Sequence, residues 1–196
     1  MSNWVAYVTN QVPSMSDADR ENNVLQIANY FRAKGWTDNA IAAMCGNIQT
    51  ESYLNPGQYQ HGFPVGTESG GFGLVQWTPR TKFSDWAGAD WETNYDLQPA
   101  RIQYELENGL QWQYRPGYSE GYISFSDFAH STAGTDYLAG AFLYYYEGPA
   151  DPAASIALRR SQAAHWYTFL GNTPSPSLNI PVWLLFKIRW QRRGGV

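Results

Sequence analysis

The sequence predicts a mainly α-helical domain (α+β class) with one long irregular segment in its middle. Apolar residues recur at helical spacing over several segments, and eight glycines or prolines fall between positions 56 and 73. The chain has 196 residues, enough for one domain with an appendage. A domain of this size buries a core large enough to fold without a disulfide or a metal.

Two helices near the start are marked by caps and breakers. Apolar side chains share one face of residues 22–34, and Gly35 ends that segment. Thr37 and Asp38 are capping residues for a second helix, which runs out near residues 50–52 because Asn55-Pro56-Gly57 cannot continue it. Further helical patterns cover residues 79–86, 96–108, 124–131, 135–146 and 152–170.

Composition and charge exclude several classes of function. Through residue 152 the chain carries seven basic and seventeen acidic residues, a net charge of −10, which argues against nucleic acid as the main partner. A single cysteine excludes an internal disulfide, and three scattered histidines lack metal-ligand spacing, so we expect no metal and no cofactor. No signal peptide is visible, and no apolar run approaches the ~20 residues of a membrane-spanning helix.

We expect three regions along the chain: an N-terminal arm (1–21), a folded domain (22–171), and a linker with an apolar, basic tail (172–196). The tail sequence NIPVWLLFKIRWQRRGGV is interpreted as a docking segment, because an apolar stretch of this kind exposed in solution would aggregate. An interfacial membrane segment and a stub left by processing are the alternatives.

Two runs of residues carry the chemistry. Glu51 follows Ile48 by three positions and Met44 by seven, which places it on the buried side of a helix at its C-terminal end. Partial burial and the negative end of the helix dipole both raise the pKa of a carboxyl there, so it could act as the general acid of glycoside cleavage. The alternative is an ordinary solvated glutamate at a helix end.

The second run is Gly70 to Thr78. Its glycines permit close backbone approach to a ligand, Gln76 offers a donor and acceptors, and Trp77 offers a stacking face. The alternative is a glycine-rich hairpin that packs on the core.

Together these runs resemble the signature of phage tail lysozymes, ES-x-x-NP followed by G-x-G-L-x-QW. Glu51–Pro56 and Gly71–Trp77 carry it, and further motifs at 40–46, 78–80, 96–106 and 142–149 follow in the family's order, so the resemblance covers about residues 22–170. Gly148 stands where the family usually has arginine. A more distant similarity is to lytic transglycosylases.

The resemblance implies a lysozyme-like bundle of six to eight helices, with a small β-hairpin or loop wall beside the cleft at residues 58–77. It implies that Glu51 is the catalytic acid and that one of Tyr144–Tyr146 is its hydroxyl neighbour. Glu68 and Glu147 are the candidates for a second carboxylate; alternatively, Glu68 is solvated and Glu147 pairs with Arg159. The expected substrate-binding residues are Tyr53, Asn55, Gln76, Trp77, Tyr145 and Glu147.

The activity implied is that of a muramidase of the phage tail, which cleaves the β-1,4 bond between N-acetylmuramic acid and N-acetylglucosamine in peptidoglycan. It would act from the virion to breach the host wall during genome entry. The alternatives are a lytic transglycosylase on the same bond and a non-catalytic wall-binding or structural tail module. The expected partners are peptidoglycan strands and, through residues 172–196, other tail proteins.

Overall fold

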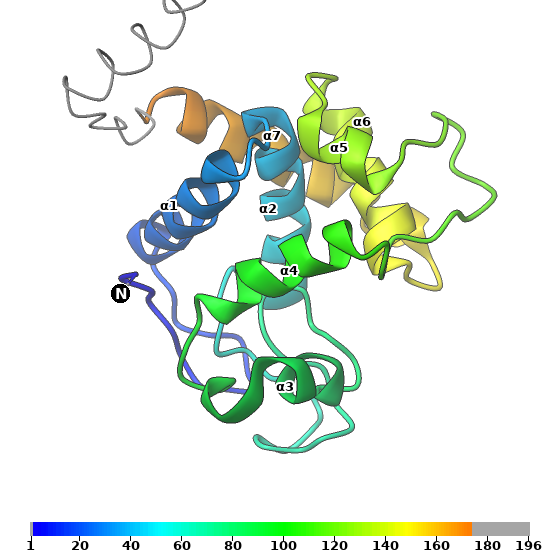
Figure 1. The fold of residues 1–196 in the computed structure, drawn as a ribbon. Coiled ribbons are helices and arrows are strands. Elements are labelled where there is room, and N and C mark those ends of the chain that lie inside the picture. Colours follow the sequence, from blue (N-terminus) through cyan, green and yellow to red (C-terminus); the bar gives the residue numbers. More distant parts are fainter. Residues whose placement is uncertain (1, 174–196) are drawn as a thin grey trace, which may run out of the picture.

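The computed structural model describes residues 2–173, which form seven α-helices and no β-strand (Figure 1). The predicted mainly α class and the predicted number of helices are confirmed. The α-helices are α1 (Asp17–Ala33), α2 (Asp38–Ser52), α3 (Thr81–Ala87), α4 (Leu97–Glu107), α5 (Phe125–His130), α6 (Thr135–Phe142) and α7 (Ile156–Gly171). Shorter turns are η1 (Gly88–Asp90), the π-helical η2 (Leu143–Glu147) and η3 (Pro152–Ala154).

The central element is α2, which α1, α5, α6 and α7 contact (Figure 1). Ten of its fifteen residues are buried, so it is a core helix rather than an amphipathic surface helix. A Cβ atom added at Gly46 would lie 2.6 Å from the backbone nitrogen of Ala163 and 2.6 Å from the carbonyl oxygen of Arg159. Glycine therefore lets α7 approach the backbone of α2 and fixes Arg159 beside it.

The residues before α1 form an extended arm that side-chain amides tie to the body. Asn23 accepts from the Val5 nitrogen at 2.9 Å and donates to the Val5 oxygen at 2.7 Å. Asn55 binds Tyr7 in the same way, at 2.9 and 2.7 Å. The two amides pair with the arm as a neighbouring strand would, although no strand forms.

Helix α1 begins at Asp17, five residues before the predicted start at 22, because Ser16 and Asp19 form a capping box. The predicted cap at Thr37 is confirmed, since its side chain accepts from the Ala40 nitrogen at 3.2 Å.

The predicted β-hairpin at residues 58–77 is wrong, and the alternative of a loop wall is what forms. Only isolated bridges join Tyr59 to Phe72 and Phe72 to Trp77 within this segment. The loop is held from outside by the buried Gln98, which accepts from the Leu74 nitrogen at 2.8 Å and donates to the Pro56 oxygen at 2.7 Å. A side chain of α4 therefore supplies bonds that a second strand would otherwise make.

The predicted docking tail falls outside residues 2–173. Among the helices of that range, none combines the length and the apolar character needed to cross a membrane.

Candidate functional site

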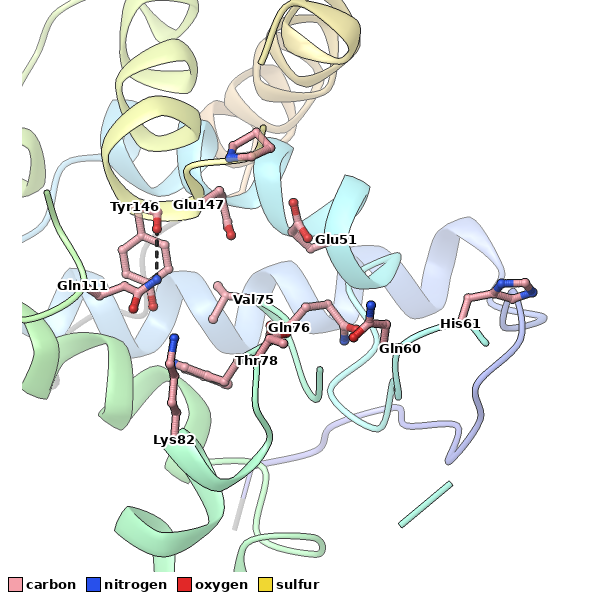
Figure 2. Close-up of a pocket in the computed structure, with 12 residues that line it drawn as sticks. Glu51, Gln60, His61, Val75, Gln76, Thr78, Lys82, Gln111, Tyr146 and Glu147 are labelled. Atoms are coloured by element: carbon pink, nitrogen blue, oxygen red, sulfur yellow. Dashed lines mark hydrogen bonds between the residues drawn. The ribbon is translucent and has the colours of Figure 1, made fainter. Parts of the chain in front are cut away.

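A pocket of about 410 Å³ lies where the C-terminal end of α2 meets the loop wall, α3 and η2 (Figure 2). Figure 2 shows Glu51 and Glu147 along one side and Gln76, Thr78 and Lys82 along the other. The lining is mostly polar and is formed by Glu51, Gln60, His61, Val75, Gln76, Trp77, Thr78, Lys82, Gln111, Tyr146, Glu147 and Pro149.

Glu51 occupies the last turn of α2 and forms an ion pair with Arg159 of α7, with 2.5 Å between Oε1 and Nη2. The arginine is itself buried, and it also donates to Oδ1 of Asn47 at 3.0 Å and to Oγ of Ser155 at 3.1 Å. Bonds to both helices hold the guanidinium in place, so the Glu51 carboxylate has a fixed partner and a fixed direction. The suggested pair between Glu147 and Arg159 does not form, because Arg159 binds Glu51.

Glu147 is the second carboxyl group of the pocket. It ends η2, and its Oε1 atom is buried without a hydrogen-bond partner in the described structure. Burial raises the pKa of Glu147 well above its usual range; the charges of Glu51 and Glu105 raise it further, and only Arg159 acts in the opposite direction. The carboxyl therefore keeps its proton at pH values at which an ordinary glutamate has lost it.

A third carboxyl, Glu105 of α4, lies behind the pocket and is fully paired. It accepts from Nε1 of Trp77 at 3.0 Å, from Nε of Arg101 at 2.9 Å and from the Tyr146 hydroxyl at 2.5 Å. Burial and the charge of Glu105 raise the pKa of Tyr146 well above its usual range. Tyr146, one of the three tyrosines from which a hydroxyl neighbour of Glu51 was expected, thus donates to Glu105. The sequence signal for Glu105 was its spacing of four residues from Arg101.

Four of the residues singled out by the sequence line the pocket: Glu51, Gln76, Trp77 and Glu147. Gln76 is anchored by its own side-chain nitrogen, which donates to the Gln58 oxygen at 3.1 Å and to the Gly73 oxygen at 2.9 Å. Trp77 is only 3% exposed, and its ring stacks on Phe83 with 4.7 Å between centroids. Its indole therefore belongs to the core and offers no open face for a sugar.

The other four candidates do not line the pocket. The Glu68 side chain is 80% exposed and lies 3.8 Å from Nη2 of Arg80, outside the cleft. Tyr53 caps α2 in a left-handed conformation (φ 60°), and the amide of Asn55 is used to hold the arm. Tyr145 is 1% exposed and packs in an aromatic cluster with Trp112.

The structure adds lining residues that the sequence did not single out for binding. Gln60 and His61 belong to the same loop as Gln76, and this shared loop was the available signal. Lys82 of α3 also lines the pocket. Gln111 lines it as well, and its side-chain nitrogen donates to the backbone carbonyl oxygen of Tyr146 at 3.0 Å. No local pattern marks Gln111, which reaches the pocket only through the tertiary fold.

At Gly148 the chain departs from the family pattern, and the structure shows what takes the space. Gly148 has a positive φ of 57°, and its carbonyl oxygen accepts from Nη1 of Arg115 at 2.9 Å. A side chain at position 148 would collide with this guanidinium. The Arg115 guanidinium thus fills the space next to the Cα atom of residue 148.

Within residues 2–173 no three His, Cys, Asp or Glu side chains are grouped so that they could hold a metal ion.

Comparison with known proteins agrees with this geometry. Residues 22–170 match the model of the family described as phage tail lysozyme. The chain is also 39% identical over 160 residues to morphogenesis protein 1 of Bacillus phage B103, an alignment that covers 81% of this chain and 42% of that relative. The chain therefore spans less than half the length of that relative. The resemblance seen in the sequence is confirmed: this chain belongs to the phage tail lysozyme family.

Proposed function

We propose that the protein is a tail-associated muramidase, which hydrolyses the β-1,4 bond between N-acetylmuramic acid and N-acetylglucosamine to open the host wall during genome entry. The observation that carries this proposal is the pair of carboxyl groups, Glu51 and Glu147, that face one polar pocket. Most glycoside hydrolases use two carboxyl groups whose different surroundings give them different pKa values. Membership of the phage tail lysozyme family supports both the reaction and the location.

The pocket offers suitable groups for a glycan strand. Amide side chains of Gln60, Gln76 and Gln111, with the hydroxyl of Thr78, supply donors and acceptors for sugar hydroxyls and N-acetyl groups. In the proposed reaction, Glu51 donates a proton to the glycosidic oxygen, the bond from that oxygen to C1 breaks, and positive charge develops on the sugar ring. The Glu51 carboxylate that remains after this transfer stabilises the positive charge on the sugar ring.

Water completes the proposed reaction by attacking C1. The pocket is lined mainly by polar side chains that can hold a water beside the reacting carbon. A lytic transglycosylase would instead let a hydroxyl of the substrate attack, and it is the alternative reaction for the same site. Glu147 argues against a non-catalytic wall-binding module. Its Oε1 atom is buried without a partner, which lowers the stability of the folded protein and brings no benefit to a domain that only binds.

Replacing Glu51 by Gln tests the proposal, because the amide keeps the shape but has no proton to donate. We expect purified wild type to clear peptidoglycan in a zymogram and Glu51→Gln to leave it intact at equal folded protein. Glu107→Gln is the matched control, since Glu107 is an exposed residue at the end of α4. Equal clearing by Glu51→Gln and wild type would contradict the assignment.

A further inference from the structure

Glu147 is the second carboxyl group that faces the pocket, and the reaction above assigns no step to it. Its Oε1 atom is buried, and in the described structure no donor reaches it. Arg159 is the guanidinium close enough to influence it, but its nitrogens are already bound to Glu51, Asn47 and Ser155. Glu147 is thus a partly buried acid whose Oε1 atom is buried and lacks a counter-ion of its own.

Glu51 has the opposite environment. Its Oε1 atom lies 2.5 Å from Nη2 of Arg159, so the arginine binds Glu51 as a carboxylate. Cleavage of a glycosidic bond nevertheless requires a proton for the leaving oxygen. Among residues 2–173, Glu147 is the other carboxyl that lines the pocket, and it projects from η2 toward the same space as Glu51 (Figure 2).

We propose that Glu147 stores the proton which Glu51 delivers to the glycosidic oxygen. This inference rests on the proposed glycosidase function and assigns the roles within it. The two carboxyls share no hydrogen bond in the structure, so the transfer between them passes through a water in the pocket.

The surrounding charges favour this distribution. Two carboxylates that face one pocket repel each other, so the charge of Glu51 disfavours the ionised form of Glu147. Glu105, behind the pocket, adds a further negative charge, and burial raises the pKa of Glu147 more than any of these charges. The charged and titratable groups around Glu147 are Glu51 (α2), Lys82 (α3), Glu105 (α4), Tyr146 (η2), Arg159 (α7), His61 (loop wall) and Arg115, which binds the next residue.

Protons and electrons balance over the cycle. The Glu147 proton passes through the water to Glu51, which gives it to the glycosidic oxygen as the electron pair of the C1–O bond leaves with that oxygen. Glu51, Glu147 and Arg159 then carry a net negative charge opposite the cationic sugar ring. A second water adds its oxygen to C1 and returns a proton to Glu147, so one water is consumed and the resting site is restored.

Carbon-13 NMR of the full-length protein, labelled at the glutamate carboxyl carbons, tests where the proton lies. We expect one glutamate carboxyl to ionise at a higher pH than the exposed glutamates and its signal to be absent from Glu147→Gln. A Glu147 signal that shifts together with those of the exposed glutamates would overturn the proposal. Because this readout uses the unmutated protein, it decides the question even if Glu147→Gln folds poorly.

Kinetics on solubilised, uncrosslinked glycan strands test what the proton does. We expect Glu147→Gln to lose about 100-fold in kcat with little change in KM, because a transferable proton contributes at least that factor. Glu147→Asp, which can carry a proton, should recover part of the loss, and Glu107→Gln should match wild type. A Glu147→Gln enzyme with wild-type kcat and an unchanged alkaline limb of its pH profile would overturn the proposal.

The two proposals fail in different ways. If Glu51→Gln is inactive while Glu147→Gln works normally, the muramidase assignment stands and the role of Glu147 falls. If wild type releases no fragments from glycan strands, the proposed function itself fails, whatever the NMR titration shows.

Discussion

Burial of Glu147 affects the stability of the fold as well as its chemistry. In the unfolded chain this carboxyl titrates near pH ~4.3, whereas in the folded protein its pKa is raised well above the usual range. Between these two pKa values the folded protein holds a proton that the unfolded chain has lost. The free energy of unfolding therefore falls as pH rises through this window, by about 1.4 kcal/mol for each pH unit.

Glu147→Gln should remove this dependence, because the amide does not titrate. We expect the variant to gain stability relative to wild type as pH rises above about 5, until the Glu147 pKa is passed and the difference levels off. Thermal unfolding of both proteins between about pH 4.5 and 8 measures it. Parallel curves for the two proteins would contradict the burial seen at this residue.

Arg159 holds Glu51 through a planar set of donors that lysine cannot reproduce. Arg159→Lys should therefore reduce muropeptide release by roughly tenfold to 100-fold, because small displacements of a catalytic group have effects of that size. Arg160→Lys is the matched control, since the neighbouring Arg160 is paired with Glu120 and does not line the pocket. Similar rates for the two variants would show that the charge at position 159 suffices.

At the level of single residues, the sequence predicted Glu51 and Gln76 because short motifs and a helix end surround them. It did not predict the ion pair between Glu51 and Arg159, which joins residues 108 positions apart. It could not predict the burial of Trp77 and Tyr145 for a similar reason: aromatic rings suit a sugar and a core equally well, and only the fold shows which faces are covered. Both rings prove to be buried.

Among the helices, the contact between α2 and α7 sets the geometry of the site. Gly46→Ala would place a Cβ atom 2.6 Å from the backbone of α7, so the two helices would have to separate. We expect a loss of about 1–3 kcal/mol in the free energy of unfolding, with a Tm lowered by roughly 2–4 °C per kcal/mol. Gly171→Ala, where nothing lies within 4 Å, is the control; equal Tm values would refute the close packing.

Periodicity and caps identified the helices well, but they did not show how each helix ends. The segment predicted as a helix over 135–146 changes at Leu143 into the π-helical η2, which directs the Tyr146 hydroxyl to Glu105 and places Glu147 in the pocket. A π turn keeps the apolar pattern of an α-helix, so the pattern alone does not separate the two. The sequence predicted which residues form the loop wall. It did not predict the hydrogen bond from the Leu74 nitrogen to Gln98, because that bond joins the loop to a side chain of α4.

For the molecule as a whole, we predict that catalysis and docking are separable. Asn172 and Thr173 hydrogen-bond the last turn of α7, so a truncation after Thr173 keeps the described domain whole. The truncated protein should release muropeptides at the wild-type rate and should be missing from assembled particles, because the segment Val182–Trp190 beyond it is proposed to dock to another tail protein. Loss of activity with normal incorporation would reverse these two roles. Binding of the isolated tail peptide to anionic vesicles would favour the membrane alternative.

Mass spectrometry of the fragments released from purified peptidoglycan tests the central claim most directly. A hydrolase that works through Glu51 leaves N-acetylmuramic acid with a reducing end, and we predict such ends from wild type and none from Glu51→Gln. Products lighter by one water, the mass of an anhydro sugar, would identify a transglycosylase. The same reducing ends from Glu51→Gln in equal amount would contradict the assignment of this pocket as the muramidase site.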